Sequence, residues 1–120
     1  MCDGFVHKKC RKSLLETVTA STIINAQRPG EEPFQICIEV GVPYQVNDDP
    51  DEWACPVALK PLYKNLHDAH GGDAVQSLCL ALSLVFDLLS AFREKGGKLY
   101  MTAGDDFPIE AYRFGVAAKE

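Results

Sequence analysis

Two histidines with nearby carboxylates are the residues best suited to metal chemistry in this sequence of 120 residues. His67 and His70 are three positions apart, Asp68 lies between them, and Asp73 follows. Imidazoles at this spacing in a turn can converge on one ion, and a carboxylate can join them. A structural zinc site has four ligands, and a catalytic one needs a third firm ligand, which this segment does not offer. We therefore assign no metal and no cofactor, and keep His67 and His70 as candidate ligand-binding residues.

The five cysteines are the next residues that could carry chemistry. Cys2, His7 and Cys10 could bind a soft metal, but they lack the short Cys-x-x-Cys spacing of such sites. Cys55 could act as a nucleophile beside a histidine, yet it shares strand parity with Trp53 and with apolar neighbours, which predicts a buried and inert thiol. Because the number of cysteines is odd and their spacing irregular, we expect reduced thiols and a cytoplasmic protein.

Four carboxylates fall within five positions at Asp48, Asp49, Asp51 and Glu52. This segment has enough oxygen ligands for calcium, but it lacks the glycine and the distal glutamate of an EF-hand loop, and Pro50 interrupts it. A solvated turn is the simpler interpretation. Phosphate-binding glycine loops, G-x-S-x-G elbows and H-E-x-x-H pairs are absent from the sequence. We assign no catalytic residue, and the missing signatures favour a protein that is not an enzyme without excluding one.

The longest element that the sequence predicts is a helix over Asp73–Lys95. Asp73 can accept a bond from a first-turn amide, Gln76 stands where a capping box places Glu or Gln, and Gly96 and Gly97 follow the last helical residue. Polar side chains form one narrow stripe around this helix, and apolar side chains cover nearly all the rest. The apolar stripe of an ordinary surface helix is only a little over roughly 100° wide. The apolar surface of this helix is much wider, so one sheet cannot cover all of it.

Alternating and β-branched residues predict the strands that accompany the helix. Thr19–Gln27 and Phe34–Val42 form a hairpin with one apolar face, and Lys98–Thr102 is a short last strand. Trp53–Leu59 is a third strand, bulged or at a sheet edge because Pro56 has no N–H for a ladder. The expected fold is α+β with two layers: a mainly antiparallel sheet of about four strands, in the order β-β-β-α-β, and one long helix packed across it.

The length and net charge of the chain limit the number of domains and the classes of partner that we expect. We expect residues 1–120 to form one domain, with 1–17 as a flexible arm or short helix. The net charge of −5 argues against nucleic acid or an anionic membrane, and the charge of Asp87 would be costly inside a bilayer. Residues 104–120 are expected to dock on the domain because they hold several large apolar side chains, namely Phe107, Ile109, Tyr112 and Phe114.

Two short motifs connect the sequence to a known family. Trp53-Ala54-Cys55-Pro56 fits the pattern W-x-C-P, and Gly71-Gly72-Asp73-Ala74-Val75-Gln76-Ser77-Leu78 fits G-x-D-x-x-Q-x-L. With these motifs the chain resembles a family of small uncharacterised bacterial proteins that share a domain of unknown function. The resemblance covers Thr19 to about Pro108. It implies a bacterial, cytosolic source and the same order of elements, and it supplies no activity.

The excess apolar surface of the helix gives the leading functional hypothesis. We expect a non-enzymatic interaction module that contacts a second copy of itself, as a homodimer, or another protein. Phe86, Leu89 and Phe92 are the expected anchors, because buried aromatic and aliphatic side chains anchor such contacts. The competing explanation is that the arm or the tail covers the same flank. A different alternative is a small enzyme or ligand-binding domain with a pocket near His67 and His70, beside a helix N-terminus that favours anions.

Overall fold

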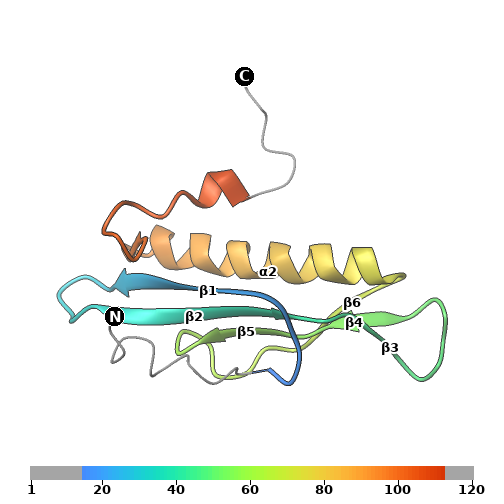
Figure 1. The fold of residues 1–120 in the computed structure, drawn as a ribbon. Coiled ribbons are helices and arrows are strands. Elements are labelled where there is room, and N and C mark those ends of the chain that lie inside the picture. The colour runs from blue at the N-terminus through green and yellow to red at the C-terminus, as the bar shows by residue number, and fades with distance from the viewer. Residues whose placement is uncertain (1–14, 113–120) are drawn as a thin grey trace.

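The computed structural model describes residues 15–112 of the chain. Two antiparallel sheets lie beneath one long helix (Figure 1), which is the predicted α+β arrangement with an additional small sheet. In chain order the elements are β1 (Val18–Gln27), β2 (Phe34–Gly41), β3 (Tyr44–Gln45), β4 (Trp53–Cys55), β5 (Val57–Lys60), β6 (Ala69–Gly71), α2 (Ala74–Glu94), β7 (Lys98–Tyr100) and the 3-10 helix η1 (Ile109–Tyr112).

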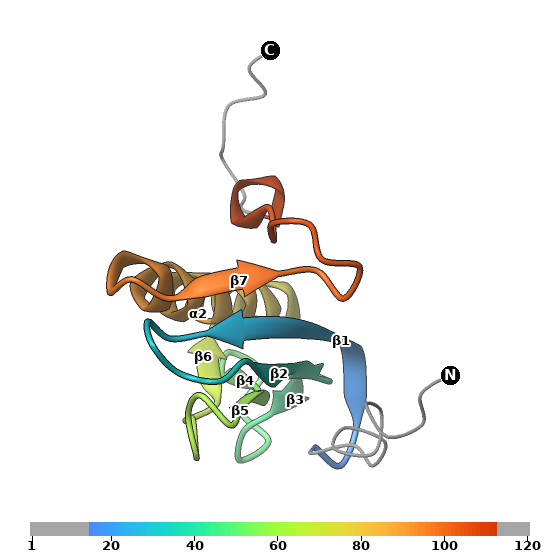
Figure 2. The same ribbon diagram turned by 90° about the vertical axis from the view of Figure 1, so that its left-hand side faces the viewer.

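The larger sheet has four strands in the order β5-β2-β1-β7, and all its neighbours are antiparallel. In the predicted hairpin, Ile24 of β1 lies opposite Ile36 of β2, and both are buried. Since directly opposed residues share one face of a sheet, this register places the apolar side chains of both strands toward α2. Figure 2 shows β7 beside β1 at the edge of this sheet, where it pairs with Asn25–Gln27.

The smaller sheet has the order β3-β4-β6 and was not predicted. Its formation divides the expected third strand at Pro56: β4 joins the small sheet, whereas β5 pairs with β2 in the large one. Proline cannot donate to a ladder, so the chain changes sheets at this residue. The Pro56 carbonyl accepts a bond from the N–H of Gly41 at 2.7 Å, and this bond holds the junction of the two sheets.

Helix α2 begins and ends close to the predicted residues. The Asp73 carboxylate accepts the N–H of Gln76 at 2.8 Å, and the Gln76 amide oxygen accepts the N–H of Gly72 at 2.6 Å. The first bond satisfies a backbone donor that the first turn leaves unpaired, and the second pairs the N–H of Gly72 just before the cap. At the other end Gly96 has a φ of 97°, a left-handed conformation that glycine adopts readily and that commonly closes a helix.

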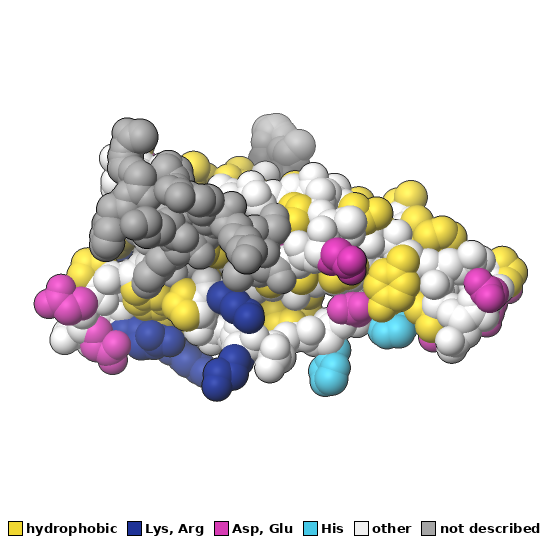
Figure 3. Space-filling model, turned by 60° about the horizontal axis from the view of Figure 1, so that its bottom comes forward, with side chains coloured by type: hydrophobic (Ala, Val, Ile, Leu, Met, Phe, Trp, Pro, Cys, Tyr) yellow, Lys and Arg dark blue, Asp and Glu magenta, His cyan; other side chains and the backbone are white. Residues whose placement is uncertain are grey.

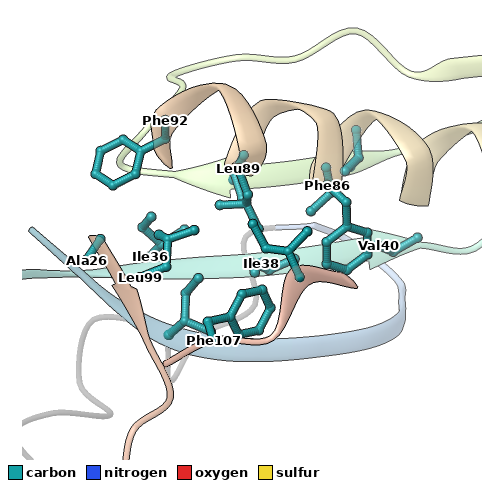
Figure 4. Close-up of a cluster of buried hydrophobic side chains, with 14 of the residues drawn as sticks. Ala26, Ile36, Ile38, Val40, Phe86, Leu89, Phe92, Leu99 and Phe107 are labelled. Atoms are coloured by element: carbon teal, nitrogen blue, oxygen red, sulfur yellow. The ribbon is translucent and has the colours of Figure 1, made fainter. Parts of the chain in front are cut away.

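The core lies between α2 and the two sheets. Ala81, Val85 and Leu89 have no exposed surface, and they line the face of α2 that meets the strands. Figure 4 shows Leu89 directed at Ile36 and Ile38, and Phe107 in the same cluster although it comes from the tail. The core is therefore built by elements from both halves of the chain.

The segment after β7 is docked on the domain as far as it is described. The N–H of Phe107 donates to the carbonyl of Leu99 at 3.0 Å, and the side chains of Phe107 and Ile109 are buried. The Tyr112 ring stacks on Phe86 and Phe107, with centroid distances of 5.2 and 4.9 Å. Phe114 and nearly all of the expected N-terminal arm lie outside the described residues.

Candidate functional site

The two candidate histidines lie in the same region but do not form a common site. Both are exposed, and they project separately from one face of the molecule, shown in cyan in Figure 3. His70 Nδ1 is 3.6 Å from a carboxylate oxygen of Glu52, whereas Asp68 accepts a bond from the hydroxyl of Tyr44. Within residues 15–112, no three His, Cys, Asp or Glu side chains are close enough together to hold a metal ion.

Asp68 has a structural task, which explains why it does not turn toward the histidines. Its bond from Tyr44 connects β3 to the segment before β6. The pKa of Tyr44 is raised, first by this hydrogen bond and then by burial and by the negative charge of Asp68. Asp73, the other carboxylate of the predicted cluster, is occupied as the cap of α2.

The acidic segment forms the turn between β3 and β4, in agreement with the simpler interpretation. Asn47 and Asp48 have positive φ angles of 54° and 58°, which a reversing chain requires and which Asn and Asp tolerate better than most residues. The Asp49 carboxylate accepts the N–H of Asp51 at 2.9 Å. A carboxylate that bonds its own turn in this way stabilises the turn itself.

The cysteines differ from one another in environment. Cys55 is fully buried in the core, and its thiol lies 3.4 Å from the carbonyl oxygen of Gly41. Burial raises the pKa of the Cys55 thiol, and the nearby charge of Asp68 raises it further, so an unreactive thiol is expected. Cys37 is disulfide-bonded, so the expectation of reduced thiols is wrong at this position. The cytoplasmic location, which rested partly on those thiols, stays a prediction. The soft-metal group of Cys2, His7 and Cys10 lies outside the described residues.

The three residues expected to anchor a partner belong to the core of the domain instead. Phe86 and Phe92 are each 8% exposed and Leu89 is 0% exposed. Figure 4 shows all three directed from α2 toward the strands or the tail. Tyr112 and Phe107 supply the cover over Phe86, which is the competing explanation that the sequence offered. Apolar composition did not distinguish helix positions that face the chain itself from positions that face outward.

A different set of α2 residues carries the apolar surface that the fold leaves uncovered. Val75 is 69% exposed and Leu80 is 44% exposed, which are large fractions for aliphatic side chains. At 100° per residue, the small side chains of Cys79 and Ser83 lie between these two on the outward face. We call Val75, Cys79, Leu80 and Ser83 the outer surface of α2. A helical wheel groups these four residues on one side of α2. The sequence alone does not show which side of the helix faces the sheets, so this surface was not predicted.

Comparison with known proteins gives one match. A family described as "Domain of unknown function (DUF6968)" matches residues 25–109. The chain belongs to this family. No curated protein and no solved structure matches the sequence. In this DUF6968 domain the match begins within β1 and ends at the buried Ile109, so it contains all of α2 and most of the docked segment. The family's description supplies no activity.

Helix α2 of the DUF6968 domain is also the one helix in residues 15–112 that is long and apolar enough to cross a membrane by length and composition. Only 33% of its most apolar window is buried. The helix packs on β2, β4, β5, β6, β7 and η1, so its inner face is occupied by protein. The unusual feature is therefore the outer face of the first half of the helix, which is uncharged and combines the exposed aliphatic side chains of Val75 and Leu80 with polar Gln76 and Ser83.

Proposed function

We propose that this protein is a non-enzymatic interaction module that forms a homodimer through the outer surface of α2. The observation that carries this proposal is the exposure of Val75 and Leu80 on a helix whose opposite face is already buried. Exposed aliphatic side chains on one element are a common mark of a protein contact when they are contiguous. Burying them against a second copy removes this apolar area from water, which is the main favourable term in association.

The shape of the surface favours another helix as the occupant. Cys79 and Ser83 are small and lie one turn apart, while Val75 and Leu80 flank them. A helix that approaches along the small residues can come close and pack between the larger ones, as ridges pack into grooves. This geometry is poorly suited to lipid, since the inner face of the same helix is committed to the core through Ala81 and Val85.

Charge favours a second copy of the chain. From Ala74 to Phe86, α2 has no charged side chain, so this segment itself brings no like charges together in a contact between two copies, although Asp73 and Asp87 flank it and each chain has a net charge of −5. An antiparallel arrangement also sets the two helix dipoles against each other, which is favourable. Such a contact is isologous: each copy presents the same residues, and every substitution acts twice.

The expected energies follow from the exposed fractions. Fully burying a leucine side chain contributes about 1.5–3 kcal/mol, so burying the 44% of Leu80 that is exposed contributes about 0.7–1.3 kcal/mol in each copy. Leu80→Gln removes this term from both copies and is expected to raise the dimer dissociation constant roughly tenfold to a hundredfold. The stability of each subunit should change little, because an exposed position is altered.

The test is sedimentation equilibrium of the wild-type chain, Leu80→Gln and the matched control Val42→Gln. Val42 has the same exposed fraction, 44%, and follows β2, outside α2. We expect Leu80→Gln to weaken the dimer and Val42→Gln to leave its dissociation constant unchanged. Equal effects of the two substitutions would show that α2 is not the contact surface.

A further inference from the structure

A second surface feature, independent of the helix contact, is a hollow of ≈ 340 Å³ at the C-terminal end of α2. Segments that are distant in sequence converge on it: the β1–β2 turn, the chain after β5, and the end of α2 with the turn that follows. The residues around it are Arg28, Pro29, Leu62, Tyr63, Phe92, Lys95 and Gly97. Its volume is at the lower end of the range for small-molecule sites, roughly 300–1,000 Å³.

The guanidinium of Arg28 is held in place by aromatic rings. Its Cζ lies 5.1 Å from the centroid of Phe34 and 5.6 Å from that of Phe92, and the two rings meet edge to face. Stacking on ring faces orients a guanidinium and leaves the N–H groups at its edge available. A Cβ on Gly97 would lie 2.3 Å from the Phe92 ring, so the glycine is what allows this ring its position.

The two cations at the hollow have no carboxylate partner within the part of the chain that the structure describes. Arg28 and Lys95 take part in none of the ion pairs there. A neighbouring hollow differs in this respect: it is lined by Asp106 as well as Arg93, and Arg93 is already paired with Glu110 at 2.8 Å. Figure 3 shows Lys and Arg side chains, in dark blue, in the half of the molecule that holds the β1–β2 turn, with Asp or Glu side chains, in magenta, at its tip.

We infer that this hollow binds a small oxyanion, a carboxylate or a phosphate, attached to a flat apolar group. The fork of Arg28 suits an oxyanion because its parallel N–H groups can donate to two oxygens at once, and Lys95 adds a second positive charge. Pro29, Leu62 and Phe92 give the apolar part of the ligand a surface to contact. The hydroxyl of Tyr63 can orient it.

Phenyl phosphate and phenylacetate are suitable probes, with inorganic phosphate as the comparison that lacks the ring. Binding is followed by the amide resonances of Gly97 and Tyr63 in labelled protein. We expect either or both ring-bearing probes to shift these resonances and to bind more tightly than inorganic phosphate, and their relative affinities distinguish phosphate from carboxylate. Absence of any shift at Gly97 and Tyr63 with both probes would overturn the site, and equal affinity for inorganic phosphate would overturn the apolar part.

Substitutions test the role of the two cations. Arg28→Gln should weaken binding about tenfold or more, because charge-assisted bonds are the strong ones. Lys95→Gln should weaken it as well, and it alters an exposed side chain that folding does not need. The control Lys98→Gln removes the same charge outside the hollow and should leave the affinity unchanged. If Lys95→Gln and Lys98→Gln have equal effects, the binding reflects overall charge and the inference is wrong.

Discussion

Replacing Phe107 with alanine is expected to destabilise the domain by about 3–5 kcal/mol, the usual cost of truncating a buried phenylalanine. The side chain is 2% exposed and belongs to the cluster of buried hydrophobic side chains that Figure 4 shows. Its ring also stacks on Tyr112. For a domain of this size, the loss corresponds to a fall in Tm of roughly 10–20 °C.

Tyr112→Ala provides a graded comparison for Phe107→Ala. Tyr112 is 41% exposed, but its ring contacts both Phe86 and Phe107. Aromatic pairs contribute about 0.5–1.5 kcal/mol each beyond area burial, so we expect a loss of about 1–3 kcal/mol. Urea unfolding followed by the fluorescence of Trp53, the only tryptophan, measures both variants. A loss below about 1 kcal/mol for Phe107→Ala would refute the claim that this segment is part of the core.

Two further predictions concern the start of the central helix and the buried thiol. Asp73→Ala should cost about 1 kcal/mol in urea unfolding by removing the N-cap, whereas Ser83→Ala should stay within about 0.5 kcal/mol; equal losses would contradict the capping role. At a pH near 9.0, the ordinary pKa of a cysteine thiol, Cys55 should resist alkylation in the folded protein and react after unfolding. Peptide mapping by mass spectrometry measures the modified fraction. The pKa of the Cys55 thiol is higher in the folded protein than in the unfolded chain. The stability that the buried neutral thiol contributes is therefore complete below the pKa of the unfolded chain, and it is lost as pH rises through the pKa of the folded protein. Fast modification of native Cys55 would contradict this.

The part of the fold that could be predicted is the part with strong periodicity. Phe34–Gly41 alternates clearly, and α2 has both caps and a helical repeat, so these elements were predicted within one or two residues. Strands β3 and β6 have two and three residues, too few for alternation to be recognised, and β4 was expected only as the first part of the strand Trp53–Leu59, without the change of sheet. The small sheet depends on the change of sheet at Pro56, which separates β4 from β5 and is a tertiary effect.

The candidate sites were less predictable for a related reason. Sequence spacing placed His67, Asp68 and His70 together, but their side chains turn toward different partners, which only the fold determines. Apolar character likewise indicated that α2 has more than one covered face, yet it could not separate Phe86, which the tail covers, from Leu80, which nothing in residues 15–112 covers fully. The hollow beside Arg28 depends on segments far apart in the chain and had no signal in the sequence.

The molecular mass of the protein in solution is the most direct test of the proposed homodimer. Sedimentation equilibrium over a series of micromolar concentrations should give a mass approaching twice the 13.2 kDa of one chain, and dilution should shift it toward one. A mass that stays at 13.2 kDa up to the highest concentration would contradict self-association through the outer surface of α2.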